Sequence, residues 1–168
     1  MKMSMYQASV PVFVRALNNL AAILAKAEAH AKAEKIDPAV LVQARLYPDM
    51  LPLSKQIQIA SDNAKGLASR LAGVEIPKFE DNESTLPELI ARLRKTVDYL
   101  QTFKPEQIDG SEDKAIELPM HGGGVLKLQG AAYLSQRALP NVFFHCATAY
   151  AILRHNGIKI GKDDFLGK

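Results

Sequence analysis

The sequence predicts an all-α protein, a four-helix bundle with a long crossover and a small β-hairpin inserted between the third and fourth long helices. Three observations support this prediction. Apolar residues recur at steps of three and four in four long segments. Prolines, glycines and capping residues stand at the ends of those segments. A period of two is clear only between residues 115 and 129. A chain of 168 residues suits one domain and is too short for two ordinary ones, so we expect a single helical domain over residues 1–168.

The first long helix is expected from Ser4 to about His30, with a proline near its start. Its apolar face consists of Val10, Phe13, Leu17, Leu20 and Leu24. Asp37 and Pro38 then supply a cap and a first-turn proline for a short helix that reaches about Leu46. Both elements therefore have a sequence signal for their start as well as a helical period.

The second long helix has the clearest periodicity in the chain. Its apolar positions are Met50, Leu53, Ile57, Ala60, Ala64, Leu67 and Leu71. Such a seam is typical of a helix that packs in a bundle. Pro52 lies in the first turn and Gly73 lies just past the end, which is the order expected of a helix start and stop.

The third long helix begins with a capping box, because Thr85 is followed three residues later by Glu88. Its buried positions are Leu86, Ile90, Leu93, Val97 and Leu100, and Pro105 follows its end. The crossover to the last helix contains two alternating segments, residues 115–120 and 125–129, which predict a hairpin that turns at His121–Gly124. The tail, residues 158–168, is expected to be extended, with Phe165 and Leu166 available to hold it against the helices.

The fourth long helix, Pro140–Gly157, carries polar residues on a face that should be buried. At helical spacing Asn141, His145 and Thr148 share one face, and Ile152 continues it. The adjoining side is apolar as well, through Leu139, Val142, Phe143, Cys146, Tyr150 and Leu153. A short polar line therefore passes through a mostly buried helix, and we take this line as the candidate functional site.

Composition and charge match a soluble globular protein. Apolar residues make up 48% of the chain and charged residues 23%, and the formal net charge is +3. The densest cationic group, Arg92, Arg94 and Lys95, shares its helix with Glu88 and Asp98, so we expect a solvated face there. Asp62 and Lys65 are likewise expected to form a surface pair. Without a basic patch with interleaved aromatic residues, nucleic acid is not an expected partner.

Cys146 is the single cysteine, so it cannot form an internal disulfide, and this fits a reducing compartment. The N-terminal residues do not have the pattern of a signal peptide, and no uninterrupted apolar run approaches the length of about 20 residues that spans a bilayer. We therefore expect a cytoplasmic protein with no membrane partner. Cys146 follows His145 directly, but neighbours on a helix diverge by about 100°, so a buried structural thiol is favoured over a Cys-His dyad.

A histidine-rich metal site is not expected. The chain has only His30, His121, His145 and His155. His145 and His155 are separated by roughly 15 Å at 1.5 Å per helical residue, too far to share one ion. Asn141 and His145, by contrast, are four apart and can point at one object. For His145 two interpretations stay open: a core histidine satisfied by a hydrogen bond, or a pocket residue that binds a ligand or acts as a general base.

Gln56 lies on the second long helix, seven residues from both Asp49 and Asn63, so the three align beside the apolar seam. Two interpretations are open here too. The flank either faces water or lines the bundle interior opposite His145, where it would supply hydrogen bonds to a small ligand.

Several longer segments resemble one family. They are LYPDMLPL at 46–53, QIQIASD at 56–62, FFHCATAYAILRHNG at 143–157 and GKDDFLG at 161–167. With the order of the helices, these segments resemble the DinB-like superfamily of four-helix-bundle proteins, many of them considered metalloenzymes, and within it a branch of unassigned function. The resemblance covers nearly the whole chain.

The resemblance implies where a metal site would be. In metal-binding members one histidine of the second helix and two of the last helix hold the ion. Matching the last helix places His145 at one of those positions and Asn141 at the other, and the second-helix position falls near Gln56. Two of three imidazoles are then missing, so the usual three-His site is degenerate and no metal is expected. Established relatives often handle thiol cofactors or isomerise small acids, and they are frequently dimers, so the resemblance also implies a homodimer.

Two functions follow from these expectations. The first is a small-molecule pocket within the bundle, lined by His145, Asn141, Thr148 and Gln56, with or without catalysis. The alternative is a noncatalytic dimeric interaction or structural module, in which the buried polar line sets helix register. The sequence assigns no cofactor and no catalytic residue.

Overall fold

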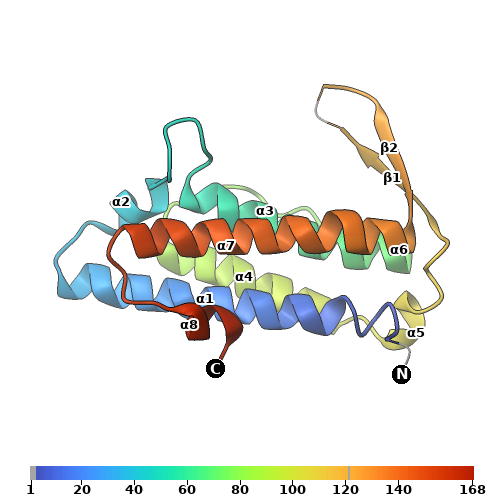
Figure 1. Ribbon diagram of the computed structural model, residues 1–168, viewed down its shortest axis with the longest axis horizontal. Coiled ribbons are helices and arrows are strands. Elements are labelled where there is room, and N and C mark those ends of the chain that lie inside the picture. Colours follow the sequence, from blue (N-terminus) through green and yellow to red (C-terminus); the bar gives the residue numbers. More distant parts are fainter. Residues whose placement is uncertain (1–2, 121) are drawn as a thin grey trace.

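A computed structural model describes residues 3–120 and 122–168. Its long helices are α1 (Val10–Ala33), α3 (Leu53–Ala72), α4 (Leu86–Gln101) and α7 (Leu139–His155), and they lie side by side (Figure 1). The short helices are α2 (Pro38–Gln43), α5 (Pro105–Ile108), α6 (Gly130–Ala132) and α8 (Lys162–Leu166). The prediction of a mostly helical protein is confirmed.

The core forms where the apolar faces of the long helices meet. Helix α1 packs mainly on α4, and α3 packs on both α7 and α4. The periodic residues of α3 are buried, and among the largest fully buried side chains are Phe13, Leu17, Leu24, Ile57, Leu67 and Leu93. Met50 is the exception in the predicted seam. It is only half-buried because α3 begins at Leu53, with Pro52 as the residue before its first turn.

Helices α3 and α7 are antiparallel. Gln56, near the start of α3, contacts His145 in the middle of α7, whereas Arg70, near the end of α3, contacts Tyr133, which precedes α7. This arrangement places the polar line of α7 against the first half of α3. It therefore determines which residues share the candidate site.

The predicted hairpin is present in the crossover between α4 and α7. Strands β1 (Ala115–Pro119) and β2 (Val125–Gln129) pair antiparallel, with Ile116 opposite Leu128. Within the two strands only Ile116 is buried, and the hairpin projects away from the helices (Figure 1). His121, part of the predicted turn, lies outside the described residues. Gly122–Gly124 all have φ between 88° and 96°, which glycine adopts at little cost.

A π-helical segment, η1 (Tyr133–Ala138), joins α6 to α7, so the chain is helical without a break from Gly130 to His155. Pro140 explains the wider turns. Its nitrogen cannot donate a hydrogen bond to the preceding turn, and its ring would crowd a carbonyl there in a regular α-helix. The helix therefore continues through the proline by widening just before it.

The tail differs from the prediction. Instead of being extended throughout, it forms α8, because Asp164 accepts a hydrogen bond from the Gly161 backbone nitrogen at 2.8 Å and closes the first turn. The role expected of Phe165 is observed, since its ring packs edge-on against Tyr150 with centroids 6.0 Å apart. The short helix α2 also ends earlier than predicted, at Gln43 rather than about Leu46.

The prediction that Arg92 lies on a solvated face is wrong. Arg92 is only 3% exposed, and its guanidinium donates to Glu83 at 2.9 Å and to Asp62 at 2.9 Å, and is paired with Asp81 at 3.0 Å. The connection between α3 and α4 folds back over α4 and covers the side chain. Burial alone would lower the pKa of Arg92, but the Glu83 hydrogen bond and the nearby carboxylates raise it overall, so the guanidinium stays charged.

Lys65 is likewise buried rather than part of a surface pair. It keeps the predicted ion pair with Asp62 at 3.1 Å, but its ammonium also donates to the Pro77 carbonyl at 2.7 Å and lies 4.1 Å from the centre of the Phe79 ring. The ring of Phe79 thus sits over the cation, and the same connection covers both Lys65 and Arg92.

Among the described residues, α1 is the one helix whose length and apolar composition would allow it to cross a membrane. Core helices of soluble proteins meet the same criterion. Here Phe13, Leu17 and Leu24 of α1 are fully buried against the other helices, which accounts for its apolar composition.

Candidate functional site

His145 lies at the seam between α7 and α3. Its side chain is buried, with 8% of the residue exposed, and its Nδ1 is 2.6 Å from Oε1 of Gln56. Gln56 is itself 2% exposed. Of the two interpretations of Gln56, the structure therefore shows the one in which this residue faces inward toward His145.

The backbone of Leu51 determines how the Gln56 amide is oriented. Gln56 donates from Nε2 to the Leu51 carbonyl at 3.0 Å, and a carbonyl oxygen can only accept. The other end of the amide, Oε1, therefore faces His145. Because Oε1 also can only accept, Nδ1 of His145 carries the proton. In the neutral ring this leaves Nε2 with its lone pair.

Burial lowers the pKa of His145, which keeps the ring neutral near pH 7. Over the described residues Nε2 of His145 has no hydrogen-bond partner. The side-chain atoms that are both fully buried and without a partner are Gln58 Oε1 and Arg92 Nε, and Nε2 is not among them. Nε2 therefore keeps some contact with solvent. It can accept a hydrogen bond or a proton from a molecule that approaches the seam.

Asn141 and Thr148 lie about one turn to either side of His145 on α7. Asn141 is half-buried, and Thr148 is buried with its hydroxyl donating to the Phe144 carbonyl at 2.8 Å. Among the described residues, no hydrogen bond joins either side chain to His145 or Gln56. The structure thus brings together Gln56 and His145 of the predicted set, with Asn141 and Thr148 beside them.

Two features of the site were not predicted from the sequence. The Leu51 carbonyl orients Gln56, but a backbone group has no sequence signal. The Phe144 ring stands edge-on to the His145 ring with centroids 5.2 Å apart, and Phe144 is 58% exposed. The sequence shows that Phe144 directly precedes His145, but it does not show that the Phe144 side chain is exposed.

The residues present do not fit the three-imidazole metal site that the resemblance implies. In the described part of the chain, no three His, Cys, Asp or Glu side chains lie close enough to hold an ion. The equivalent donors are one imidazole and two amides, and the oxygen of the Gln56 amide is already bound to Nδ1 of His145.

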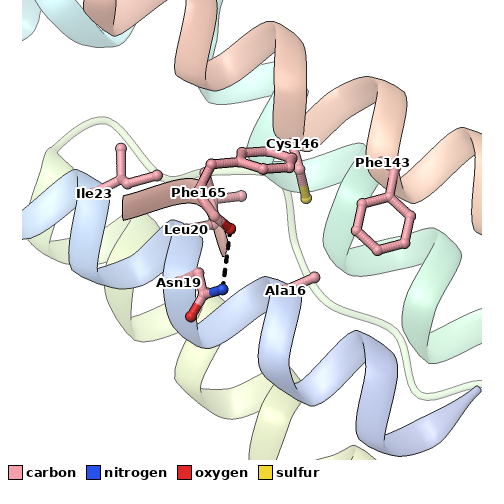
Figure 2. Close-up of a pocket in the computed structure, with 7 residues that line it drawn as sticks. All are labelled: Ala16, Asn19, Leu20, Ile23, Phe143, Cys146 and Phe165. Carbon is pink, nitrogen blue, oxygen red and sulfur yellow. Dashed lines mark hydrogen bonds between the residues drawn. The ribbon is translucent and has the colours of Figure 1, made fainter. Parts of the chain in front are cut away.

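Cys146 lies on a different side of α7 from His145, facing α1. It is 2% exposed, and burial raises the pKa of its thiol to about 12, so the reactive thiolate is scarce at neutral pH. Figure 2 shows its sulfur among Phe143 and Phe165, beside a hollow of about 10 Å³, roughly the space of one water molecule. Cys146 and His145 thus belong to different surfaces of the helix.

A family model described as a domain of unknown function, DUF1993, matches residues 5–166. The chain belongs to this family. The crystal structure of a DinB family member protein from Shewanella denitrificans matches this DUF1993 protein with a TM-score of 0.88 at 39% sequence identity, covering 97% of this chain and 92% of that chain. No curated protein matches. The likeness to DinB-like proteins of unassigned function, expected from the sequence, is confirmed.

Proposed function

We propose that this DUF1993 protein binds a small molecule at the α3–α7 seam, with Nε2 of His145 accepting a hydrogen bond from the ligand. The observation that supports the proposal is the 2.6 Å contact between Gln56 Oε1 and His145 Nδ1. It fixes the proton on Nδ1 and leaves the other ring nitrogen as an acceptor that is not sealed from solvent.

The proposal includes a degenerate metal site. Gln56 lies near the position where the resemblance implies a histidine ligand, and its amide binds the remaining imidazole directly. In this arrangement Asn141 and Thr148 would line the pocket beside His145 and supply further hydrogen bonds. We also infer that the four long helices form a four-helix bundle of the DinB type, with the pocket within it, in a cytoplasmic protein.

The proposal is tested by ¹⁵N NMR of the His145 ring with two matched probes, phenol and anisole. Phenol donates a hydrogen bond and anisole cannot. Phenol is expected to shift the Nε2 resonance in a saturable way, and anisole is expected to leave it unchanged. The variant His145→Ala should lose saturable phenol binding, whereas His155→Ala, at an exposed position of the same helix, should retain it.

Metal analysis of untagged protein purified without chelator gives a second test. We expect less than stoichiometric zinc, iron or nickel, because one imidazole and two amides are weak ligands for these ions. A stoichiometric transition metal would contradict the degenerate site. Equal shifts with phenol and anisole would contradict the role of Nε2 as acceptor.

The alternative function, a dimeric interaction module, has its own supporting observation. Most of the large exposed apolar residues lie on the hairpin, on α7 or in the connection between α2 and α3: Leu46, Tyr47, Leu51, Met120, Val125 and Phe144. The hairpin and this connection project from the same side of the helices (Figure 1). A two-stranded hairpin is marginally stable alone, so a second copy that covers this side would stabilise it.

Sedimentation velocity over a range of protein concentrations tests the homodimer. The variant Phe144→Ser and a hairpin variant, Val125→Lys, are expected to shift the protein toward monomer without lowering its helix content. A protein that sediments as a monomer at all concentrations would contradict this alternative.

A further inference from the structure

Helix α8 is held on α1 by polar contacts at the surface. Asn19 donates to the Phe165 carbonyl at 3.1 Å, Arg15 donates to the Leu166 carbonyl at 2.7 Å, and Lys26 pairs with Asp164. The Asn19 contact is drawn in Figure 2. No residue of α8 is buried. The tail therefore rests over the space between α1 and α7 rather than filling it.

Phe165 leaves space on more than one side. It lines the small, less open hollow of about 10 Å³ next to Cys146 (Figure 2) and also a more open hollow of about 310 Å³. We call the larger hollow the α8 groove. Its lining comes from α1, α7 and α8: Val12, Arg15, Ala16, Asn19, Phe143, Phe165 and Leu166. Its volume lies at the small end of the range for ligand sites, about 300–1,000 Å³.

The lining of the α8 groove is mostly apolar and includes one cation, Arg15. Val12, Ala16, Phe143 and Phe165 present carbon to it. Arg15 is exposed and uses one hydrogen bond, to the Leu166 carbonyl, so most of its five N–H donors remain free. Among the described ion pairs Arg15 has none, while Asp164 of the tail is paired with Lys26. A carboxylate is the group that matches a guanidinium with free donors in an apolar groove.

We propose that the α8 groove binds a small monocarboxylate with an apolar chain, such as a medium-chain fatty acid. Its carboxylate accepts hydrogen bonds from Arg15, and its chain lies between Ala16 and Phe143, with its end toward the small hollow at Cys146. This site does not depend on the proposed function, because it lies between α1 and α7 whereas His145 and Gln56 lie between α7 and α3.

The first experiment compares octanoate with octylammonium, which has the same chain length and the opposite charge. Both are titrated into ¹⁵N-labelled full-length protein below their micelle concentrations. Octanoate is expected to give saturable shifts at Ala16, Phe143 and Cys146, and octylammonium is expected to give none. The variant Arg15→Gln, at an exposed position, should weaken octanoate binding about tenfold or more, the effect of a lost charge-assisted hydrogen bond.

A matched pair of variants on α7 tests the position of the chain. Phe143→Ser removes part of the groove wall and should weaken octanoate binding, whereas Phe144→Ser changes the exposed neighbour that faces away and should not. Octanoate should also slow the reaction of Cys146, the single cysteine, with a thiol reagent. The proposal is overturned if octanoate gives no saturable shifts, if octylammonium binds equally well, or if Arg15→Gln binds octanoate as the parent protein does.

Discussion

Oε1 of Gln56 lies 2.6 Å from Nδ1 of His145, and this contact joins the first turn of α3 to the middle of α7. Both side chains are buried, so the contact is shielded from competing water. It accounts for the ring tautomer that the proposed ligand site requires. The contact also makes Gln56 the most informative position to change.

Replacing Gln56 with Glu should raise the pKa of His145 by about one unit or more, because a carboxylate beside Nδ1 favours the imidazolium. Replacing it with Leu should instead leave Nδ1–H without a partner and cost about 1–3 kcal/mol of unfolding free energy. NMR titration of the His145 ring and urea denaturation measure the two effects. A pKa for His145 in Gln56→Glu that equals that of the parent protein would show that the two side chains do not interact in solution.

The stability of the protein should fall when His145 is forced to take up a proton. The pKa of His145 is lowered in the folded state from an ordinary value of 6.5, so below pH 6.5 the unfolded chain binds more protons than the folded one. His145 therefore makes its full contribution to the free energy of unfolding above pH 6.5. This contribution is lost as the pH falls from 6.5 through the lowered pKa of the folded state. The variant His145→Gln should reduce the difference between unfolding free energies measured at pH 7.5 and pH 5. An unchanged difference would contradict the burial effect.

Arg92→Ala should destabilise the fold, because Asp62, Asp81 and Glu83 would then face one another without a cation. Breaking a fully buried ion pair costs about 3–5 kcal/mol. Here the side chains of Asp62 and Asp81 are 45% and 42% exposed, so we expect a smaller loss, about 2 kcal/mol.

Urea denaturation of Arg92→Ala and Arg94→Ala compares two arginines that lie two residues apart on one helix and differ in burial. Arg94 is exposed, and its replacement should change the unfolding free energy by less than about 0.5 kcal/mol. Equal effects of the two substitutions would mean that the carboxylates around Arg92 contribute nothing in solution.

Gly130→Ala should be among the most damaging small substitutions. An added Cβ at Gly130 would lie 1.9 Å from the Ser111 carbonyl oxygen, and backbone atoms on both sides must then move. Gly161→Ala is a matched control, since nothing lies within 4 Å of its added Cβ and its φ is −136°. Thermal unfolding should show a clear loss for Gly130→Ala and little change for Gly161→Ala.

Helical periodicity was sufficient to predict α1, α3, α4 and α7, and alternation was sufficient to predict the hairpin, because both patterns reflect which face of a single element is buried. The environment of Arg92 could not be predicted in this way. Its burial depends on a connection without regular structure that folds back over α4, and no periodicity within α4 records that contact.

Part of the candidate site could also be predicted from the sequence, because helical spacing shows which residues share a face. Spacing placed Gln56 on one edge of α3 and His145 on the inner face of α7, but which edge of α3 would meet α7 depended on packing. The sequence feature that indicates the widened turns of η1 is Pro140. Apolar spacing of three and four residues describes a regular α-helix and does not reveal such widening.

The double role of the Gln56 amide links the surface segment before α3 to the chemistry of a buried ring. If that segment moved and withdrew the Leu51 oxygen, the amide would be free to rotate by half a turn and present its NH₂ group to the imidazole. The proton would then belong on Nε2, and the outward-facing nitrogen would change from acceptor to donor. A displacement of backbone outside the helices would thereby reverse which ligands His145 can bind.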